Sequence, residues 1–357
     1  MDEAKPPIPE APAPADTLAG SPPAGADAAA PTGPGGVVRR GLDRASGSYR
    51  AMGTLFAVGL IWLFFSLKSE YFFTSDNIFN IFLQASSVGI IAAGLTVVLI
   101  TAEIDLSIGS LQALSGSVAA VIIIQHGLPL WLGIVAGLGA TVLAGAISGL
   151  LTWKLKIVSF ISTLAMLGIA QGVALLLTNG TAIAGFGPTY ALIGTYTYRG
   201  FPGAAVIAIV VFVVIHLMLT RTKLGLQIYA VGGNAEAAEF AGIRSGRVKL
   251  VALMISGLTA GIGGLIISSR LDAGNGLFGA NDLLAAVAAV VIGGTSLFGG
   301  VGSVVGTAIG VIMIASINDG LILINVPDFW QQIVIGCIII GAMAVDQLTK
   351  AARLSVL

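Results

Sequence analysis

The organisation of the chain is decided by one polar stretch, Arg221-Thr-Lys-Leu-Gly-Leu-Gln-Ile-Tyr-Ala-Val-Gly-Gly-Asn-Ala-Glu-Ala-Ala-Glu-Phe-Ala-Gly-Ile-Arg244, which separates two long apolar runs at roughly 203–220 and 248–269. Within it, Asn234 can cap the start of a helix over 235–241, and Gly242 can end that helix. A short capped helix between two runs that are long enough to cross a membrane is well placed to contact something outside the membrane.

The composition excludes an ordinary soluble domain. Of the 357 residues, 56% are hydrophobic and 10% are charged, whereas a soluble domain carries about 25% charged residues. Several runs of about 18 or more residues lack charge, which is typical of membrane helices. The sequence therefore predicts an all-α polytopic membrane protein, with the lipid bilayer as a partner and no nucleic acid.

The apolar runs predict about ten transmembrane helices in two five-span halves. They lie at about 51–68, 78–100, 106–125, 130–152, 158–178, 203–220, 248–269, 282–297, 302–320 and 329–346. Three of these, at 106–125, at 282–297 and at the start of 302–320, are rich in small residues and adjoin polar groups. We expect some of them to be broken or re-entrant helices, which a membrane tolerates where they pack in protein or line a water-filled cavity.

The positive charges predict the orientation. With the N-terminus in the cytoplasm, fourteen of the 17 Lys and Arg residues are cytoplasmic, and only Lys68, Arg199 and Arg270 lie outside. Because cytoplasmic loops carry an excess of Lys and Arg, this distribution predicts that both termini are cytoplasmic. The loop at 221–247 is then cytoplasmic as well.

The chain divides into a tail and a membrane domain. Residues 1–48 are rich in Pro and Ala and end in basic residues, so we expect a disordered cytoplasmic tail. Residues 49–348 form the transmembrane domain, which contains the loop at 221–247. The longest outside connection, 179–202, combines Gly, Pro and Tyr residues and is expected to form an ordered external cap.

Small residues recur four positions apart within the apolar runs. The pairs are Gly133/Gly137, Gly145/Gly149, Gly257/Gly261, Gly302/Gly306 and Gly306/Gly310. This spacing lets helix backbones approach closely, so it predicts tight helix packing without specifying a dimer face. A similarity between 100–110 and 292–303 indicates either an internal repeat, as transporters often have, or a chance resemblance.

No pattern for catalysis is present in the sequence. There is no Gly-Lys pair and hence no phosphate-binding P-loop, no His-Glu-x-x-His and no Gly-x-Ser-x-Gly. The two histidines lie far apart, and the single Cys337 cannot form an intrachain disulfide. We therefore expect no catalytic residue, no metal site and no cofactor bound by this chain.

Two acids, Glu103 and Asp105, lie close to Ser107 beside apolar segments, where charge is costly in a membrane. One interpretation makes them part of a translocation pathway or gate. The alternative makes them structural carboxylates that pair with a backbone amide or with a cytoplasmic Arg. The sequence alone does not decide between the two.

Uncharged polar residues within the apolar runs are further pathway candidates, because a polar solute needs donors and acceptors beside an apolar or aromatic surface. They include Gln84, Gln171, Thr295, Ser296, Asn318, Trp330 and Gln331. The simpler interpretation for each is hydrogen bonding between helices, which membrane bundles use routinely. For Trp330, an interfacial aromatic position is a second alternative.

Four stretches resemble the permease subunits of monosaccharide ABC importers of the ribose, xylose and arabinose type. The stretch from Tyr229 to Ile243 resembles their cytoplasmic coupling loop, and Glu103-Ile-Asp-Leu-Ser-Ile-Gly-Ser110 resembles their acidic motif. The stretch from Val291 to Gly306 is similar to their Gly-rich signature, and Ser316-Ile-Asn-Asp-Gly320 continues the match. The resemblance covers roughly residues 50–350 in order.

The resemblance implies a ten-span subunit of a bacterial inner-membrane importer that moves a pentose or hexose without altering it. It implies a second permease copy, two cytoplasmic ATPase subunits that use ATP and Mg, and a periplasmic sugar-binding protein. The residues that it implies for contact with the ATPase are Gly232, Gly233, Asn234, Glu236, Ala237, Ala238, Glu239 and Gly242. The rival hypothesis is a secondary transporter or facilitator that works alone, with Glu103 and Asp105 as an ion-coupling site.

Overall fold

The computed structural model describes residues 53–354, so the predicted tail at 1–48 lies outside the described residues. The helices are Gly53–Lys68, α2 (Ser75–Ile100), α3 (Ile108–Ala120), the π-helix η1 (Val121–Gln125), α4 (Leu130–Lys154), α5 (Ser159–Leu177), α6 (Pro188–Thr195), α7 (Gly203–Arg221), α8 (Lys223–Gly233), α9 (Ala235–Phe240), α10 (Ser245–Arg270), α11 (Asp282–Ile292), α12 (Val304–Leu323) and α13 (Asp328–Leu354). The strands β1 (Ile183–Ala184), β2 (Thr197–Tyr198), β3 (Phe201–Pro202) and β4 (Ala273–Gly274) form two antiparallel pairs, β1–β4 and β2–β3.

Seven helices of the described chain are long and apolar enough to cross a membrane: α2, α3 together with η1, α4, α5, α7, α10 and α12. The other three predicted spans correspond to shorter apolar helices, namely Gly53–Lys68, α11 and the segment Phe329–Gly341 of α13. The predicted all-helical fold class is therefore confirmed. The number of crossings stays a prediction.

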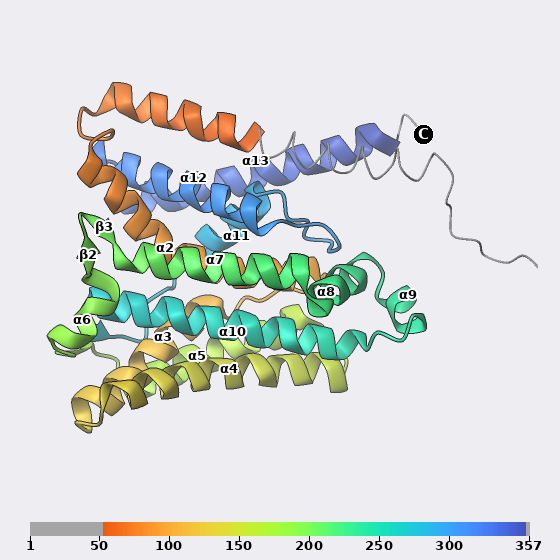
Figure 1. Ribbon diagram of the computed structural model, residues 1–357, viewed down its shortest axis with the longest axis horizontal. Helices are drawn as coiled ribbons and strands as arrows, with labels where there is room; N and C mark the ends of the chain where they lie inside the picture. Colours follow the sequence, from red (N-terminus) through yellow and green to blue (C-terminus); the bar gives the residue numbers. More distant parts are fainter. Residues whose placement is uncertain (1–52, 355–357) are drawn as a thin grey trace, which may run out of the picture. The chain divides into compact units, whose positions relative to one another are not determined.

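The long helices run side by side, with α6, β2 and β3 at one end of the bundle and α8 and α9 at the other (Figure 1). We refer to these as the α6 end and the α9 end. The connection at the α6 end is ordered, as the sequence predicted. There Tyr190 is fully buried, stacks on Phe186 with ring centroids 3.9 Å apart, and lies 2.6 Å from the hydroxyl of Ser268.

Two helices of 26 residues, α2 and α10, form the buried centre of the bundle. A Cβ atom at Gly94 of α2 would lie 1.9 Å from the Thr259 hydroxyl of α10, so only glycine permits this approach. The two helices run in opposite directions, because α2 ends against Gly232 of α8 and α10 ends against Gly194 of α6.

Glycines bring α4 into direct backbone contact with α10. A Cβ at Gly145 would lie 2.4 Å from the carbonyl oxygen of Leu253, and one at Gly257 would lie 2.4 Å from that of Thr141. The predicted tight packing is confirmed for these two helices, and it occurs within one chain.

A non-helical segment, 101–107, connects α2 to α3, and Thr101, Glu103, Asp105 and Ser107 within it are buried. Two of its amides donate to α5 hydroxyls one turn apart, Ile104 to Ser159 at 3.1 Å and Leu106 to Thr163 at 3.2 Å. Irregular backbone inside a membrane requires such partners because lipid offers none. The run predicted at 106–125 is a continuous helical stretch of 18 residues, Ile108–Gln125, that follows this segment.

A second non-helical connection, 271–281, leads from α10 to α11. It runs along α3, with Gly274 against Gly116 and Gly279 against Gly109. Gly279 has a φ of +77°, and a Cβ there would lie 2.7 Å from the Gly109 carbonyl oxygen. The 11 residues of α11 span about 16 Å, roughly half of a hydrocarbon core. The segment predicted at 282–297 is therefore a half-helix.

A long central helix, a non-helical segment and a further helix follow one another twice along the chain, and the two central helices run in opposite directions. The two similar stretches at 100–110 and 292–303, for which the sequence left a repeat or chance open, are both connections: the first joins α2 to α3 and the second joins α11 to α12. These two stretches are in contact, and the amide of Gly300 donates to the carbonyl of Ile100 at 2.9 Å.

Candidate functional site

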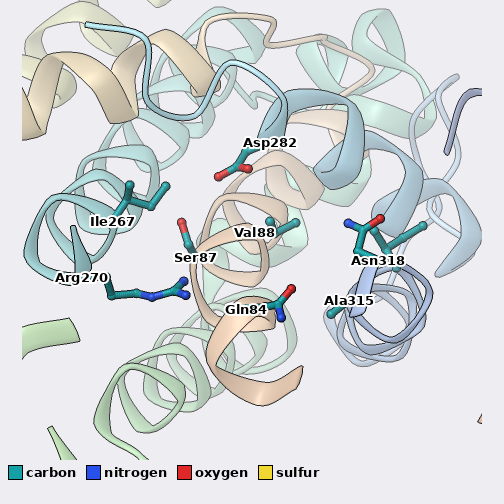
Figure 2. A pocket seen from close by; sticks show the side chains of 9 residues that line it. Gln84, Ser87, Val88, Ile267, Arg270, Asp282, Ala315 and Asn318 are labelled. Atoms are coloured by element: carbon teal, nitrogen blue, oxygen red, sulfur yellow. The ribbon is translucent and has the colours of Figure 1, made fainter. Parts of the chain in front are cut away.

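A cavity of about 330 Å³ lies between α2, α10, α11 and α12 (Figure 2), and we call it the polar cavity. Its lining residues are Gln84, Ser87, Val88, Ile267, Arg270, Asp282, Ile314, Ala315 and Asn318. Two predicted pathway residues, Gln84 and Asn318, are brought together here from α2 and α12. Its volume falls within the range of pockets for small molecules.

The polar cavity combines one cation, one anion and uncharged polar groups. Arg270, the last residue of α10, and Asp282, the first of α11, both line it. The Asn318 side-chain oxygen is buried and has no hydrogen-bond partner among the described residues. Because a buried polar atom without a partner is costly, this oxygen is available to water or to a polar solute. The lining suits an uncharged solute with several hydroxyl groups.

One carboxylate beside the polar cavity, Asp319, is buried and accepts three amide hydrogen bonds from a single face of α2. Its exposed fraction is 2%. Asn77 donates at 2.8 Å, and Asn80 and Gln84 each donate at 3.0 Å. The spacing of three and four residues places the three amides on one side of the helix. The same face of α2 therefore contacts both Asp319 and the polar cavity.

A smaller cavity of about 90 Å³ lies where α3 and α11 begin. It is lined by Gln171 of α5, a predicted pathway residue, together with Ser110 and Leu283. Gln171 is thus separate from Gln84 and Asn318. An apolar cavity of about 290 Å³ lies between α2, α7 and α12, with Phe82, Phe212 and Val311 in its lining.

Glu103 and Asp105 lie in the segment 101–107 and not in the polar cavity. Glu103 forms an ion pair with Lys249 of α10 at 2.5 Å. Asp105 accepts from the amide of Ser107 at 2.9 Å and from its hydroxyl at 2.6 Å, which is a local Asx-type turn. These contacts favour the structural interpretation, although the partner of Glu103 is a Lys and not an Arg.

The remaining predicted pathway residues are dispersed. Thr295 is buried and Ser296 accepts from the amide of Phe298, both in the connection between α11 and α12. Trp330 is 51% exposed on α13, with Gln331 beside it, and neither lines the polar cavity. The ten predicted pathway residues therefore do not form one site.

The helix α9 at the α9 end has the caps that the sequence predicted. The Asn234 side chain accepts from the amide of Ala237 at 2.9 Å, which caps the start. At the other end Gly242 has a φ of +83° and donates to Glu239, while Ile243 donates to Ala238. This pair of bonds is the Schellman motif. Two predicted coupling residues, Asn234 and Gly242, thus determine where α9 begins and ends.

The preceding helix α8, which the sequence analysis did not predict, anchors α9 to the bundle. A Cβ at Gly232 would lie 1.6 Å from the Ile100 carbonyl oxygen at the end of α2. The Tyr229 hydroxyl donates to the carbonyl of Gly302 at 2.8 Å. Burial raises the pKa of Tyr229, so this hydroxyl keeps its proton. Through these contacts α8 touches both α2 and the connection that leads into α12.

The exposed surface of α9 includes one large apolar side chain. Phe240 is 85% exposed, and Glu236 and Ala237 are exposed beside it. Ala238 is buried, and the Glu239 carboxylate accepts from the hydroxyl of Ser245 at the start of α10. Glu239 therefore fixes α9 to α10, whereas Glu236 and Phe240 are available to a partner.

Several of these residues could not be selected from the sequence. Asp319 lies in the quoted motif at 316–320, but its role depends on Asn77 and Asn80. The spacing of Asn77, Asn80 and Gln84 on a helix could have indicated a polar face. Nothing local indicated that Arg270 and Asp282 share a cavity, because the course of the non-helical connection between them brings them together.

Comparisons with known proteins show the family to which the chain belongs. Residues 77–343 match the family described as "Branched-chain amino acid transport system / permease component". The ribose import permease protein RbsC of Bacillus subtilis is 36% identical over 307 residues, which cover 85% of this chain and 95% of that protein. RbsC of Escherichia coli K12 is 38% identical over 298 residues, covering 82% of this chain and 92% of that protein.

The xylose transport system permease protein XylH of Escherichia coli K12 is 35% identical and covers 82% of this chain and 91% of its own length. No solved structure is significantly similar to the chain. The match to a permease model over most of the chain confirms the prediction of a transport subunit. The chain belongs to the family of permease components of the branched-chain amino acid transport type, and it is a multi-pass membrane protein.

Proposed function

We propose that the chain is the permease subunit of an ABC importer in a bacterial inner membrane and that it carries a monosaccharide, such as ribose or xylose. The observation that carries this proposal is the polar cavity, in which amide and hydroxyl groups face one Arg and one Asp. A neutral polyhydroxy solute would satisfy such a lining without bringing net charge into the membrane. The similarity to ribose and xylose permeases supports the same solute class.

We propose further that two ATPase subunits dock on α9 of two paired copies of this chain, on the cytoplasmic side. The exposed Glu236 and Phe240 support this assignment. A sugar-binding protein would dock at the α6 end, and both termini would be cytoplasmic, as the charge distribution predicts. ATP and Mg would be bound by the ATPase subunits, and this chain would bind no cofactor.

Reconstitution into proteoliposomes tests the proposal. With the ATPase and the binding protein supplied, we expect ATP-dependent uptake of a labelled pentose, and none when either partner is omitted. Labelled leucine is the comparison solute. Uptake driven by an ion gradient through this chain alone would support the rival secondary transporter and contradict the proposal.

The variant Glu103→Gln distinguishes the proposed ABC importer from the rival secondary transporter, in which Glu103 would couple ions. We expect it to keep ATP-driven uptake within about twofold while lowering the free energy of unfolding by about 1–3 kcal/mol, because it weakens the bond to Lys249. The exposed Glu70, changed to Gln, is the matched control and should alter neither quantity. Loss of uptake in Glu103→Gln without loss of thermal stability would favour an ion-coupling role.

A further inference from the structure

The three amides around Asp319 share one orientation. Asn77, Asn80 and Gln84 each turn their NH₂ groups toward the carboxylate oxygens of Asp319, which accept the hydrogen bonds. A Gln side chain carries its oxygen opposite its nitrogen. When the nitrogen of Gln84 donates to Asp319, its oxygen is therefore directed away from that carboxylate.

Gln84 also lines the polar cavity, across from Asn318 on α12 (Figure 2). Within the described residues, the three amides are the hydrogen-bond partners of Asp319. Rotation of the Gln84 amide by half a turn would bring its oxygen against the carboxylate, which is repulsive in a buried site. Asp319 therefore selects one of the two amide orientations of Gln84.

We propose that Asp319 is a positioning residue that holds the Gln84 amide with its oxygen toward the polar cavity, so that the cavity offers an acceptor to one hydroxyl group of a monosaccharide. This inference rests on the proposed function. Asp319 would not touch the sugar. Instead, Asp319 would determine that Gln84, the residue in contact with the sugar, presents a hydrogen-bond acceptor and not a donor to the polar cavity.

The test compares uptake of ribose with uptake of its monodeoxy analogues in the complete reconstituted importer, with a saturating binding protein. A net hydrogen bond corresponds to a rate difference of roughly 2- to 10-fold. We expect the wild type to prefer ribose over one analogue by this factor. In Asp319→Ala, water can fill the carboxylate site and both donate and accept, so the preference should fall to about one.

Asn80→Ala is the matched control, because it removes a donor to the same carboxylate oxygen but leaves the bond from Gln84. It should keep the wild-type preference. If Asp319→Ala does not reach the membrane, Gln84→Leu carries the test, since it removes the acceptor and should also abolish the preference. An unchanged preference in Asp319→Ala, or in Gln84→Leu, overturns the inference.

The same experiment distinguishes the inference from the proposed function. A wild-type importer that takes up no monosaccharide contradicts the proposed function itself. A wild-type importer that takes up ribose, with an equal preference in all variants, contradicts only the role of Asp319. Equal loss of preference in Asn80→Ala and Asp319→Ala would show that the Asp319 carboxylate and its three amide donors only hold α2 and α12 together. That result also overturns the inference.

Discussion

Replacing Gly232 with alanine is expected to reduce ATP-driven uptake by at least about tenfold. The new methyl group would lie 1.6 Å from the carbonyl oxygen of Ile100 and 2.7 Å from the amide nitrogen of Gly300. Both neighbours are backbone atoms, and they are hydrogen-bonded to each other at 2.9 Å. The substitution must therefore separate α8 from the end of α2 or break this bond. Overpacking of this kind typically costs about 1–3 kcal/mol.

Gly139 of α4 provides a matched control. A Cβ there would have no other atom within 4 Å, so Gly139→Ala should leave uptake unchanged. Uptake and ATP hydrolysis are measured together in proteoliposomes for both variants. We expect Gly232→Ala to retain the ATPase subunits and hydrolyse ATP while importing little sugar. Normal uptake in Gly232→Ala would show that the contact between α8 and α2 does not transmit movement of the ATPase subunits to the membrane helices.

The second large effect is expected at Phe240. Its side chain is 85% exposed at the end of α9, and exposed aromatic residues of this kind are often interface anchors. We expect Phe240→Ala to weaken ATPase binding by about 2 kcal/mol or more, which is about 30-fold. Glu236→Lys, which reverses an exposed charge in the first turn of α9, should abolish uptake as well. Neither variant should lower the stability of the isolated permease.

ATPase affinity is measured by titration of the purified ATPase onto the permease in nanodiscs. Phe298 is the control for Phe240, because it is 65% exposed but lies on the connection between α11 and α12. Phe298→Ala should bind the ATPase like the wild type. If Phe240→Ala binds normally and Phe298→Ala does not, the docking surface lies on that connection and not on α9.

The parts of the fold that depend on local signals were predictable from the sequence. Each predicted span contains a helix, because long apolar runs in a membrane have few alternatives. The limits of α9 were predictable because Asn234 and Gly242 act within their own turn of helix. The helix α8 was missed because Gly225, Gly232 and Gly233 are poor helix formers, and contacts with the bundle override that preference.

The polar cavity was only half predictable. Gln84 and Asn318 could be selected as polar residues in apolar runs, but nothing local indicated that they face each other. Arg270 and Asp282 join them because the connection at 271–281 turns back along α3. Such a return depends on tertiary contacts between glycines far apart in sequence. Patterns within a single helix cannot report it.

The backbone contact between α4 and α10 also determines how this protein should respond to compression. Where glycines place two backbones in contact, there is no empty volume to lose, so the pair α4 and α10 should have a low compressibility. Empty volume is instead concentrated beside α2, in the polar cavity and in the apolar cavity shared with α7 and α12. Hydrostatic pressure favours states with less void volume. Rising pressure should therefore disrupt the contacts of α12 first and leave the contacts between α4 and α10 unchanged.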